Sequence, residues 1–90
     1  MRTDEICERY SDKNVDLVVR LLDEEEGETP STVLIEGPAC ALRMLAELLM
    51  AVAEEVENDG FSISPFGAGK AHFSSTSELG VYIHRLANYR

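Results

Sequence analysis

The residues with the clearest chemical potential lie at Gly67-Ala-Gly69-Lys70, which contains the Gly-Lys pair of a phosphate-binding loop. In that motif, backbone N–H groups and the lysine bind phosphate oxygens. The motif also needs a glycine five residues before the Gly-Lys pair and a Ser or Thr after the lysine. Ser64 and Ala71 occupy these positions here. The sequence therefore favours a hairpin loop over a phosphate site, and we predict no cofactor.

Two histidines and one cysteine are the residues most able to bind a metal. His72 and His84 could meet across neighbouring strands, with Cys7 as a third ligand. Two histidines do not complete a zinc site, which takes at least three protein ligands. We therefore predict no metal site and interpret both histidines as surface or partly buried side chains.

Acidic residues cluster at Glu54, Glu55, Glu57 and Asp59. Paired carboxylates can act as general acid and base. At the C-terminal end of a helix their charge opposes the helix dipole, so helix stability does not explain them. A solvated acidic face is the favoured interpretation, and we predict no catalytic residues.

Cys7 and Cys40 are too few for a disulfide framework. Cys40 lies in the first turn of the helix expected over 38–58, where a thiol pKa can fall. A small helical residue is the simpler interpretation. A Cys7–Cys40 disulfide stays open as an alternative, which a cytoplasmic location disfavours.

The most strongly patterned stretch is 38–58, which we predict to be an amphipathic helix. At one residue per 100° of an α-helix, its apolar residues fall in one sector: Ala41, Leu42, Leu45, Leu48, Leu49, Val52, Ala53 and Val56. We expect Leu45, Leu49 and Val52 to be nearly fully buried. Met50 is the one large apolar residue near the polar side of this helix.

Alternating apolar residues predict β-strands on both sides of this helix. The strands are expected over 15–22, 31–36, 61–64, 70–74 and 79–86. The first two should form a hairpin across an acidic loop. The first and the last also have helical spacing, so a helix is the alternative for each. Residues 1–14 are poorly defined, with Ile6 and Tyr10 in a short strand or turn.

This order predicts one α+β domain over residues 1–90, with two layers. One long helix packs on one face of a mostly antiparallel four- or five-stranded sheet. The other face would stay open and would carry Val18, Arg20, Leu22, Leu34, Ser62, Ser64, His72, Tyr82 and His84. Such a face is the natural place for a protein partner or a second copy of the chain.

The chain is strongly acidic, with a net charge of −9. Residues 1–60 hold 16 acidic and 5 basic side chains, a net −11, and residues 61–90 carry +2. This charge repels phosphate backbones and argues against a nucleic-acid partner, whereas a basic protein would be attracted. No apolar run reaches the ~20 residues of a membrane span. The N-terminal stretch is polar, unlike a secretory signal, so we expect a cytoplasmic protein.

Three stretches carry a family resemblance: Val33-Leu-Ile-Glu-Gly37, Leu42-Arg-Met-Leu-Ala-Glu-Leu-Leu49, and Ser77-Glu-Leu79 before the last strand. Over residues 31–86, the order of a strand, a glycine turn, a Leu/Ala-rich helix and further strands resembles the bacterial immunity protein 32 family of polymorphic toxin systems. The resemblance implies a protein without a catalytic motif that binds and blocks a toxin.

We therefore predict a small acidic, non-enzymatic binding protein whose partner is a basic toxin. The expected partner-binding residues are Asp23, Glu24, Glu25, Glu26, Glu28, Leu34, Met50, Tyr82 and His84. The alternative is a homodimeric or small-ligand-binding domain that uses the open sheet face through Leu34, Tyr82 and His84.

Overall fold

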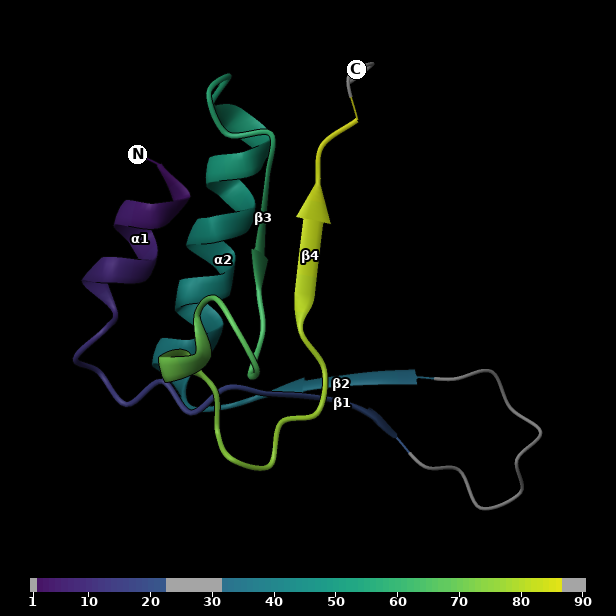
Figure 1. Ribbon diagram of the computed structural model, residues 1–90. Helices are drawn as coiled ribbons and strands as arrows, with labels where there is room; N and C mark the ends of the chain where they lie inside the picture. Colours follow the sequence, from purple (N-terminus) through teal and green to yellow (C-terminus); the bar gives the residue numbers. More distant parts are fainter. Residues whose placement is uncertain (1, 23–31, 87–90) are drawn as a thin grey trace.

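The computed structural model describes residues 2–22 and 32–86, which form two helices and four strands (Figure 1). The elements are α1 (Thr3–Arg9), β1 (Val18–Leu22), β2 (Thr32–Glu36), α2 (Ala39–Glu54), β3 (Gly60–Ile63), the short 3-10 helix η1 (Lys70–His72) and β4 (Val81–His84). The α+β class is confirmed. The single four- or five-stranded sheet is wrong, because the strands form two separate two-stranded sheets.

Each sheet is an antiparallel pair of strands, β1 with β2 and β3 with β4. In the β1–β2 hairpin, which confirms the predicted pairing, Val19 lies opposite Ile35 and Leu21 lies opposite Val33. In the second sheet, Phe61 of β3 lies opposite Ile83 of β4. The strands expected over 61–64 and 79–86 are thus confirmed in β3 and β4, with shorter bounds for the last one.

The second edge of β1 is covered by the irregular segment 72–79, which explains why the two sheets stay separate. Leu17 forms an isolated parallel bridge with Phe73, and the Leu17 N–H donates to the His72 carbonyl at 2.9 Å. Because this segment occupies the edge, β3 and β4 pair only with each other among the described residues. The strand expected over 70–74 is wrong, since most of it forms η1.

Gly69 explains why the chain turns into η1 at this point. Its φ of 81° is left-handed, a conformation that residues with a Cβ rarely adopt. A Cβ at this position would also lie 2.7 Å from Ile63 Cγ2. The left-handed turn and the close approach to β3 favour a compact turn over an extended strand.

Ser77 fastens the covering segment to β1 through its side chain. The Val19 N–H donates to Ser77 Oγ at 2.9 Å, and the Ser77 hydroxyl donates back to the Val19 carbonyl at 3.2 Å. The Leu79 N–H also donates to the Val19 carbonyl, at 2.9 Å. Ser77 is buried. Its hydroxyl supplies to Val19 the hydrogen bonds that the backbone of a neighbouring strand would otherwise supply.

The core lies between the helices and the inner faces of the two sheets. Its buried residues are Ile6, Tyr10, Val15, Leu17, Val19, Ala41, Met44, Leu45, Leu48, Ala51, Val52, Phe61 and Ile63. Leu17, Met44 and Leu48 have essentially no exposed surface. α1, β1, α2 and β3 each contribute at least one buried apolar residue, so the core is continuous.

The buried face of α2 differs from the predicted one. Leu45 and Val52 are buried as expected, but Leu42 and Leu49 are about half exposed, and Met44 and Ala51 are buried in their place. The core-facing side is rotated because a second helix, α1, packs against α2. The periodicity of α2 carries no information about the position of α1, so it could not predict this rotation.

α1 occupies the stretch that was expected to be poorly defined, with Ile6 and Tyr10 buried. The short strand or turn predicted there is therefore wrong. Seven residues are too few for an isolated stable helix, so tertiary contacts hold α1. Tyr10 Oη donates to Glu47 Oε2 of α2 at 2.6 Å, and Arg9 forms an ion pair with the same carboxylate.

Arg85 holds the C-terminal end of α2, which ends at Glu54 rather than at the expected residue 58. Its guanidinium donates to the carbonyl oxygens of Val52 at 2.5 Å and Glu55 at 3.1 Å. The last carbonyls of a helix receive no N–H of the helix itself, so the guanidinium supplies donors there, and a cation at this end is favoured by the helix dipole. The positive charge of the guanidinium therefore offsets the unfavourable effect of the acidic residues at this end of the helix.

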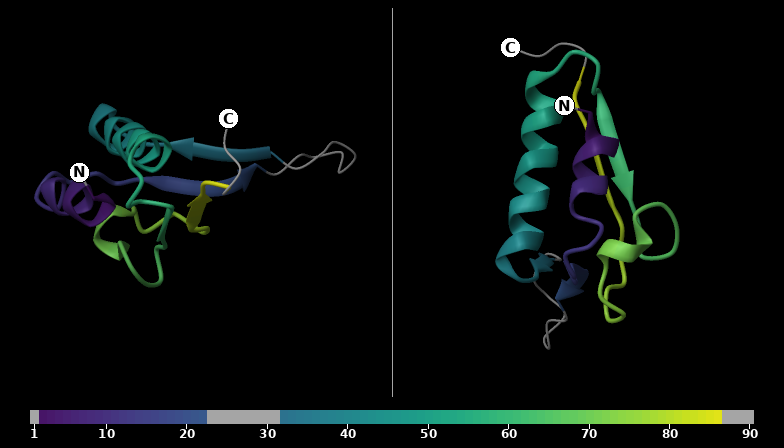
Figure 2. Two further views of the ribbon diagram at one scale, coloured as in Figure 1. Left: turned by 90° about the horizontal axis from the view of Figure 1, so that it is seen from above. Right: turned by 90° about the vertical axis from the view of Figure 1, so that its left-hand side faces the viewer.

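The β1–β2 hairpin projects from the base of the molecule at a steep angle to α2 (Figures 1 and 2). The other elements, α1, α2, β3 and β4, stand side by side above its base (Figure 2). As a result, only the part of the hairpin nearest α2 is covered by the core.

Candidate protein-binding surfaces

One face of the projecting hairpin is apolar over its described strands, β1 and β2. Val19 on this face is buried in the core, and its neighbours on the same face are Leu21, Val33 and Ile35, as the strand register requires. These three residues are about half exposed. A hairpin that faced only water would carry polar residues there.

α2 carries a second exposed apolar stripe, formed by Leu42 and Leu49. Glu47 contacts α1, and at 100° per residue Leu42 and Leu49 lie about 140° and 160° from it around the helix. The stripe thus lies on the side of α2 away from α1. The hairpin projects toward that same side (Figures 1 and 2).

We call the hairpin face and the α2 stripe together the apolar corner. Its residues are Leu21, Val33, Ile35, Leu42 and Leu49, each between 43 and 52% exposed. The half-buried residues Val81 and Ile83 of β4 pack against the core beside it. None of the seven side chains is charged.

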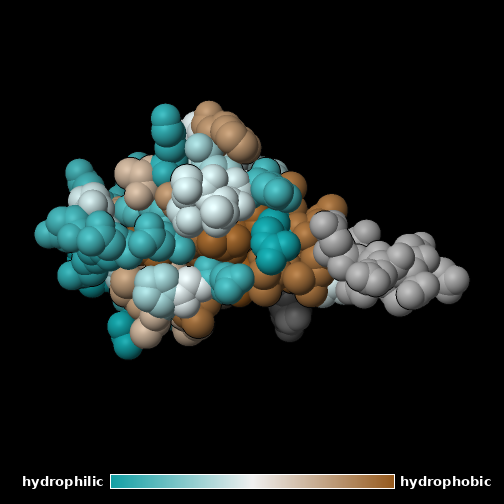
Figure 3. All heavy atoms as spheres, turned by 90° about the horizontal axis from the view of Figure 1, so that it is seen from below, coloured by the Kyte–Doolittle hydropathy of each residue, from teal (hydrophilic) through white to brown (hydrophobic). Residues whose placement is uncertain are grey.

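The lower face of the hairpin is mixed. Val18, Leu22 and Leu34 are partly exposed there and alternate with Arg20. Seen from below, hydrophobic residues gather where the hairpin leaves the body, interrupted by hydrophilic side chains, whereas the α1 side is mostly hydrophilic (Figure 3). The molecule is therefore divided into a polar side and an apolar side.

The polar side is defined by exposed carboxylates, and we call it the acidic side. Its residues are Asp4, Glu5 and Glu8 of α1 and Glu54, Glu57 and Asp59 at the C-terminal end of α2. The two helices run antiparallel, so the start of α1 lies near the end of α2 (Figure 1). Carboxylates from separate parts of the sequence thereby share one surface.

A cleft of mixed polar and apolar lining between α1 and β3 contains Cys7 and His72. His72 is buried, and burial lowers the pKa of its imidazole, an effect that its hydrogen bond to the Cys7 backbone opposes. Burial raises the pKa of the Cys7 thiol, and the nearby charge of Asp4 adds to this. Both groups are therefore neutral at pH 7, which is the opposite of a thiolate–imidazolium pair.

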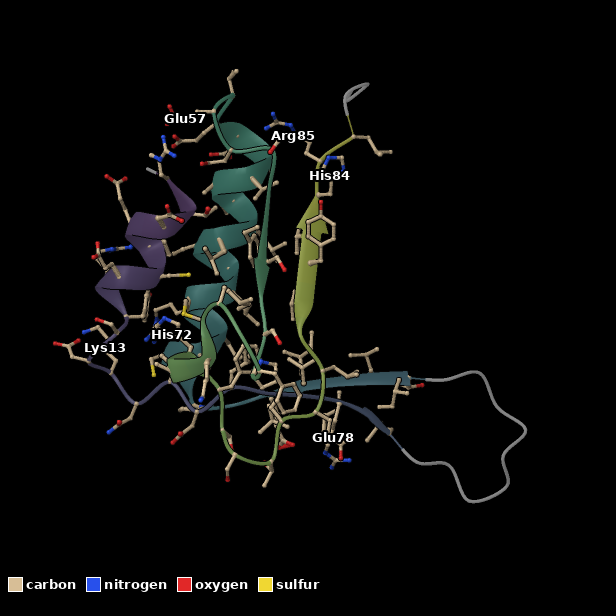
Figure 4. All side chains as sticks on the ribbon, viewed as in Figure 1. Lys13, Glu57, His72, Glu78, His84 and Arg85 are labelled. Carbon is tan, nitrogen blue, oxygen red and sulfur yellow. The ribbon has the colours of Figure 1, made fainter. Side chains whose placement is uncertain are left out.

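The two histidines do not meet. His72 lies in η1 near the base of the molecule and His84 lies near the far end of β4 (Figure 4). His72 is therefore not on an open sheet face, which corrects that expectation. No group of three His, Cys, Asp or Glu residues that could hold a metal occurs in the described parts of the chain.

The open sheet face itself is also corrected, because two sheets replace one. Apart from His72 in η1 and Ser64 just after β3, its expected residues fall on the lower face of the hairpin and on the outer face of β3–β4. Tyr82 and His84 do lie together there, with ring centroids 6.2 Å apart and both side chains exposed.

The four predicted partner-binding residues that the structure describes lie on three different elements. Leu34 is on β2, Met50 is exposed on α2, and Tyr82 and His84 are on β4. The five carboxylates of the acidic loop, Asp23, Glu24, Glu25, Glu26 and Glu28, lie outside the described residues. Sequence reasoning missed the apolar corner because it assigned Leu42 and Leu49 to the core. The sequence did contain one indication of this surface, because the apolar sector of α2 is wider than one core contact needs.

Comparison of the chain with protein-family models, with curated proteins and with solved structures finds no match. Within residues 2–22 and 32–86, no helix is long and apolar enough to cross a membrane. Function is therefore inferred from the two surfaces and from the residues that form them.

Proposed function

We propose that this chain is a non-enzymatic, cytoplasmic binding protein that neutralises a basic protein toxin. The acidic side is the surface through which it binds. The resemblance of residues 31–86 to the immunity protein 32 family supports the toxin as the kind of partner. The observation that carries the proposal is the gathering of exposed carboxylates from α1 and α2 on one side of a chain with a net charge of −9.

Electrostatics supports a basic partner. Asp4 and Glu8 on α1 and Glu57 after α2 contribute to one negative surface. Carboxylates grouped in this way raise the rate of encounter with a positively charged protein, and salt weakens the effect. Nucleic acid is repelled by the same field.

The neutral state of Cys7 and His72 in the cleft supports a role in binding rather than in catalysis. A cysteine nucleophile needs a lowered thiol pKa, whereas the pKa of Cys7 is raised. A buried imidazole with a lowered pKa is a poor cation at pH 7. We infer that these two groups serve packing between α1 and η1.

Co-expression with the product of the adjacent gene tests the proposal. We expect the two proteins to co-purify and the chain to protect cells from that product. Failure to bind any neighbouring gene product, or binding without protection, contradicts the toxin assignment.

Two charge variants of equal size test the acidic side. The first replaces Asp4, Glu8 and Glu57 with Asn or Gln, and the second replaces Asp16, Glu36 and Glu78, three exposed acids elsewhere. Association kinetics are measured at 50 and 300 mM salt. The first variant should associate at least fivefold more slowly at low salt and show a weaker salt dependence. Equal on-rates for the two variants would place the partner on another surface.

A further inference from the structure

We propose that the apolar corner is a homodimer interface, closed by a second copy of this chain. The inference does not depend on the toxin assignment, since it concerns the side of the molecule away from the acidic side. In a twofold dimer, the hairpin face of each copy, Leu21, Val33 and Ile35, packs on the α2 stripe of the other, Leu42 and Leu49. Both corners are thereby closed at once.

The hairpin is evidence for this inference because its surface is apolar but little of the molecule packs against it. Leu21, Val33 and Ile35 are exposed on its upper face, and Leu22 and Leu34 are partly exposed on its lower face. A two-stranded hairpin alone is marginally stable in water and needs a further packing surface. Within the described residues, the body of the molecule covers only its base (Figure 1).

The exposed area matches what a dimer needs. With exposed fractions of 43–52%, the five residues of the corner present roughly 400 Å² of mostly apolar surface, taking about 155–180 Å² for a fully exposed Val, Leu or Ile residue. Two copies would bury roughly 800 Å², and since homodimer interfaces are about 65% apolar, the whole interface would be roughly 1,200 Å². This reaches the lower limit for stable interfaces.

The charge distribution favours a second copy over a basic partner at this surface. All five residues of the corner are uncharged, and the carboxylates of the acidic side lie on the opposite side of α2. The five described residues of the corner therefore offer a basic partner no opposite charge. Two copies, each with a net charge of −9, repel each other less when they meet through residues that carry no charge, and within residues 2–22 and 32–86 the five residues of the corner are such a set.

Light scattering and sedimentation over about 1–500 µM test the proposal on the intact chain. We expect the mass to rise from 10.0 kDa to twice this value with concentration. Because like-charged copies repel, raising the salt from 50 to 300 mM should tighten the dimer. This salt effect is opposite to that expected for a basic partner, so the two interactions can be told apart.

A matched pair of lysine variants locates the interface. Leu49→Lys adds a charge within the corner, and Met50→Lys adds the same charge at the next residue, which is equally exposed at 53% but lies outside the corner. Lysine is a good helix former, so both should fold. Leu49→Lys should weaken the dimer at least 50-fold, and Met50→Lys by less than threefold.

Val33→Lys tests the hairpin half of the corner. Lysine is common on exposed edge strands and should not prevent folding. We expect it to weaken the dimer at least 30-fold. A wild-type chain that stays monomeric up to 500 µM overturns the proposal, as does a dimer that Leu49→Lys and Val33→Lys leave intact. A monomer whose partner complex requires these two residues would assign the corner to that partner instead.

Discussion

Replacing Leu48 or Leu49 with alanine should have very different effects on stability, although the two leucines are neighbours on α2. Leu48 is 0% exposed and Leu49 is 46% exposed. Loss of the buried methyl and methylene groups of Leu48, with the cavity that remains, should cost about 2–5 kcal/mol. This is a large part of the roughly 5–13 kcal/mol expected for 90 residues.

Leu49→Ala should cost only about 1 kcal/mol in the monomer. Roughly half of its side chain is already in water, so about half of the transfer free energy is lost, and no closed cavity forms. The difference of at least about 1 kcal/mol should separate the two melting temperatures by at least roughly 4–8 °C.

Urea and thermal unfolding at about 2 µM measure both variants with little contribution from dimerisation. The two variants should both keep the wild-type circular dichroism spectrum, which controls for misfolding. An equal loss of stability, or a larger loss for Leu49→Ala, would refute the observed rotation of α2 and restore the face that the sequence pattern predicts.

Three further substitutions test the contacts that position the elements. Ser77→Ala should lower the free energy of unfolding in urea by about 1–3 kcal/mol, because it leaves the buried N–H of Val19 without its acceptor. An unchanged urea midpoint would show that the segment 72–79 does not depend on this hydroxyl. Arg85→Met should cost about 1–2 kcal/mol of unfolding free energy, because it removes the donor to the last carbonyls of α2. Amide hydrogen exchange should increase first in that last turn. A uniform increase along the chain would contradict a capping role. The lowered folded-state pKa of His72 predicts that its contribution to stability is complete above an unfolded-state pKa of about 6.5 and is lost as pH falls through the folded-state pKa. Unfolding of wild type and His72→Gln at pH 7.5 and 5 should therefore show a smaller decrease for the variant, and equal decreases would mean that His72 carries none of the pH dependence.

Sequence patterns were sufficient for the elements whose apolar period is long or regular. The helix over 38–58 was recognised from its period, and the strands over 31–36 and 61–64 from alternation and flanking Gly and Pro. α1 was missed because seven residues carry too short a pattern. Its stability comes from Tyr10 and Arg9 contacting Glu47, which lies 37 residues further along the chain from Tyr10.

The sequence by itself determined that α2 exists, that it is amphipathic, and that the chain is acidic, because local periodicity and composition carry this information. Only the tertiary structure decided which side of α2 is buried. Its apolar sector is wider than the core contact, so the position of α1 selects Met44 and Ala51 and leaves Leu42 and Leu49 exposed. It also decided that the strands form two sheets, because Ser77 and its neighbours occupy the edge of β1. The apolar corner follows from these two long-range contacts, which no local pattern encodes.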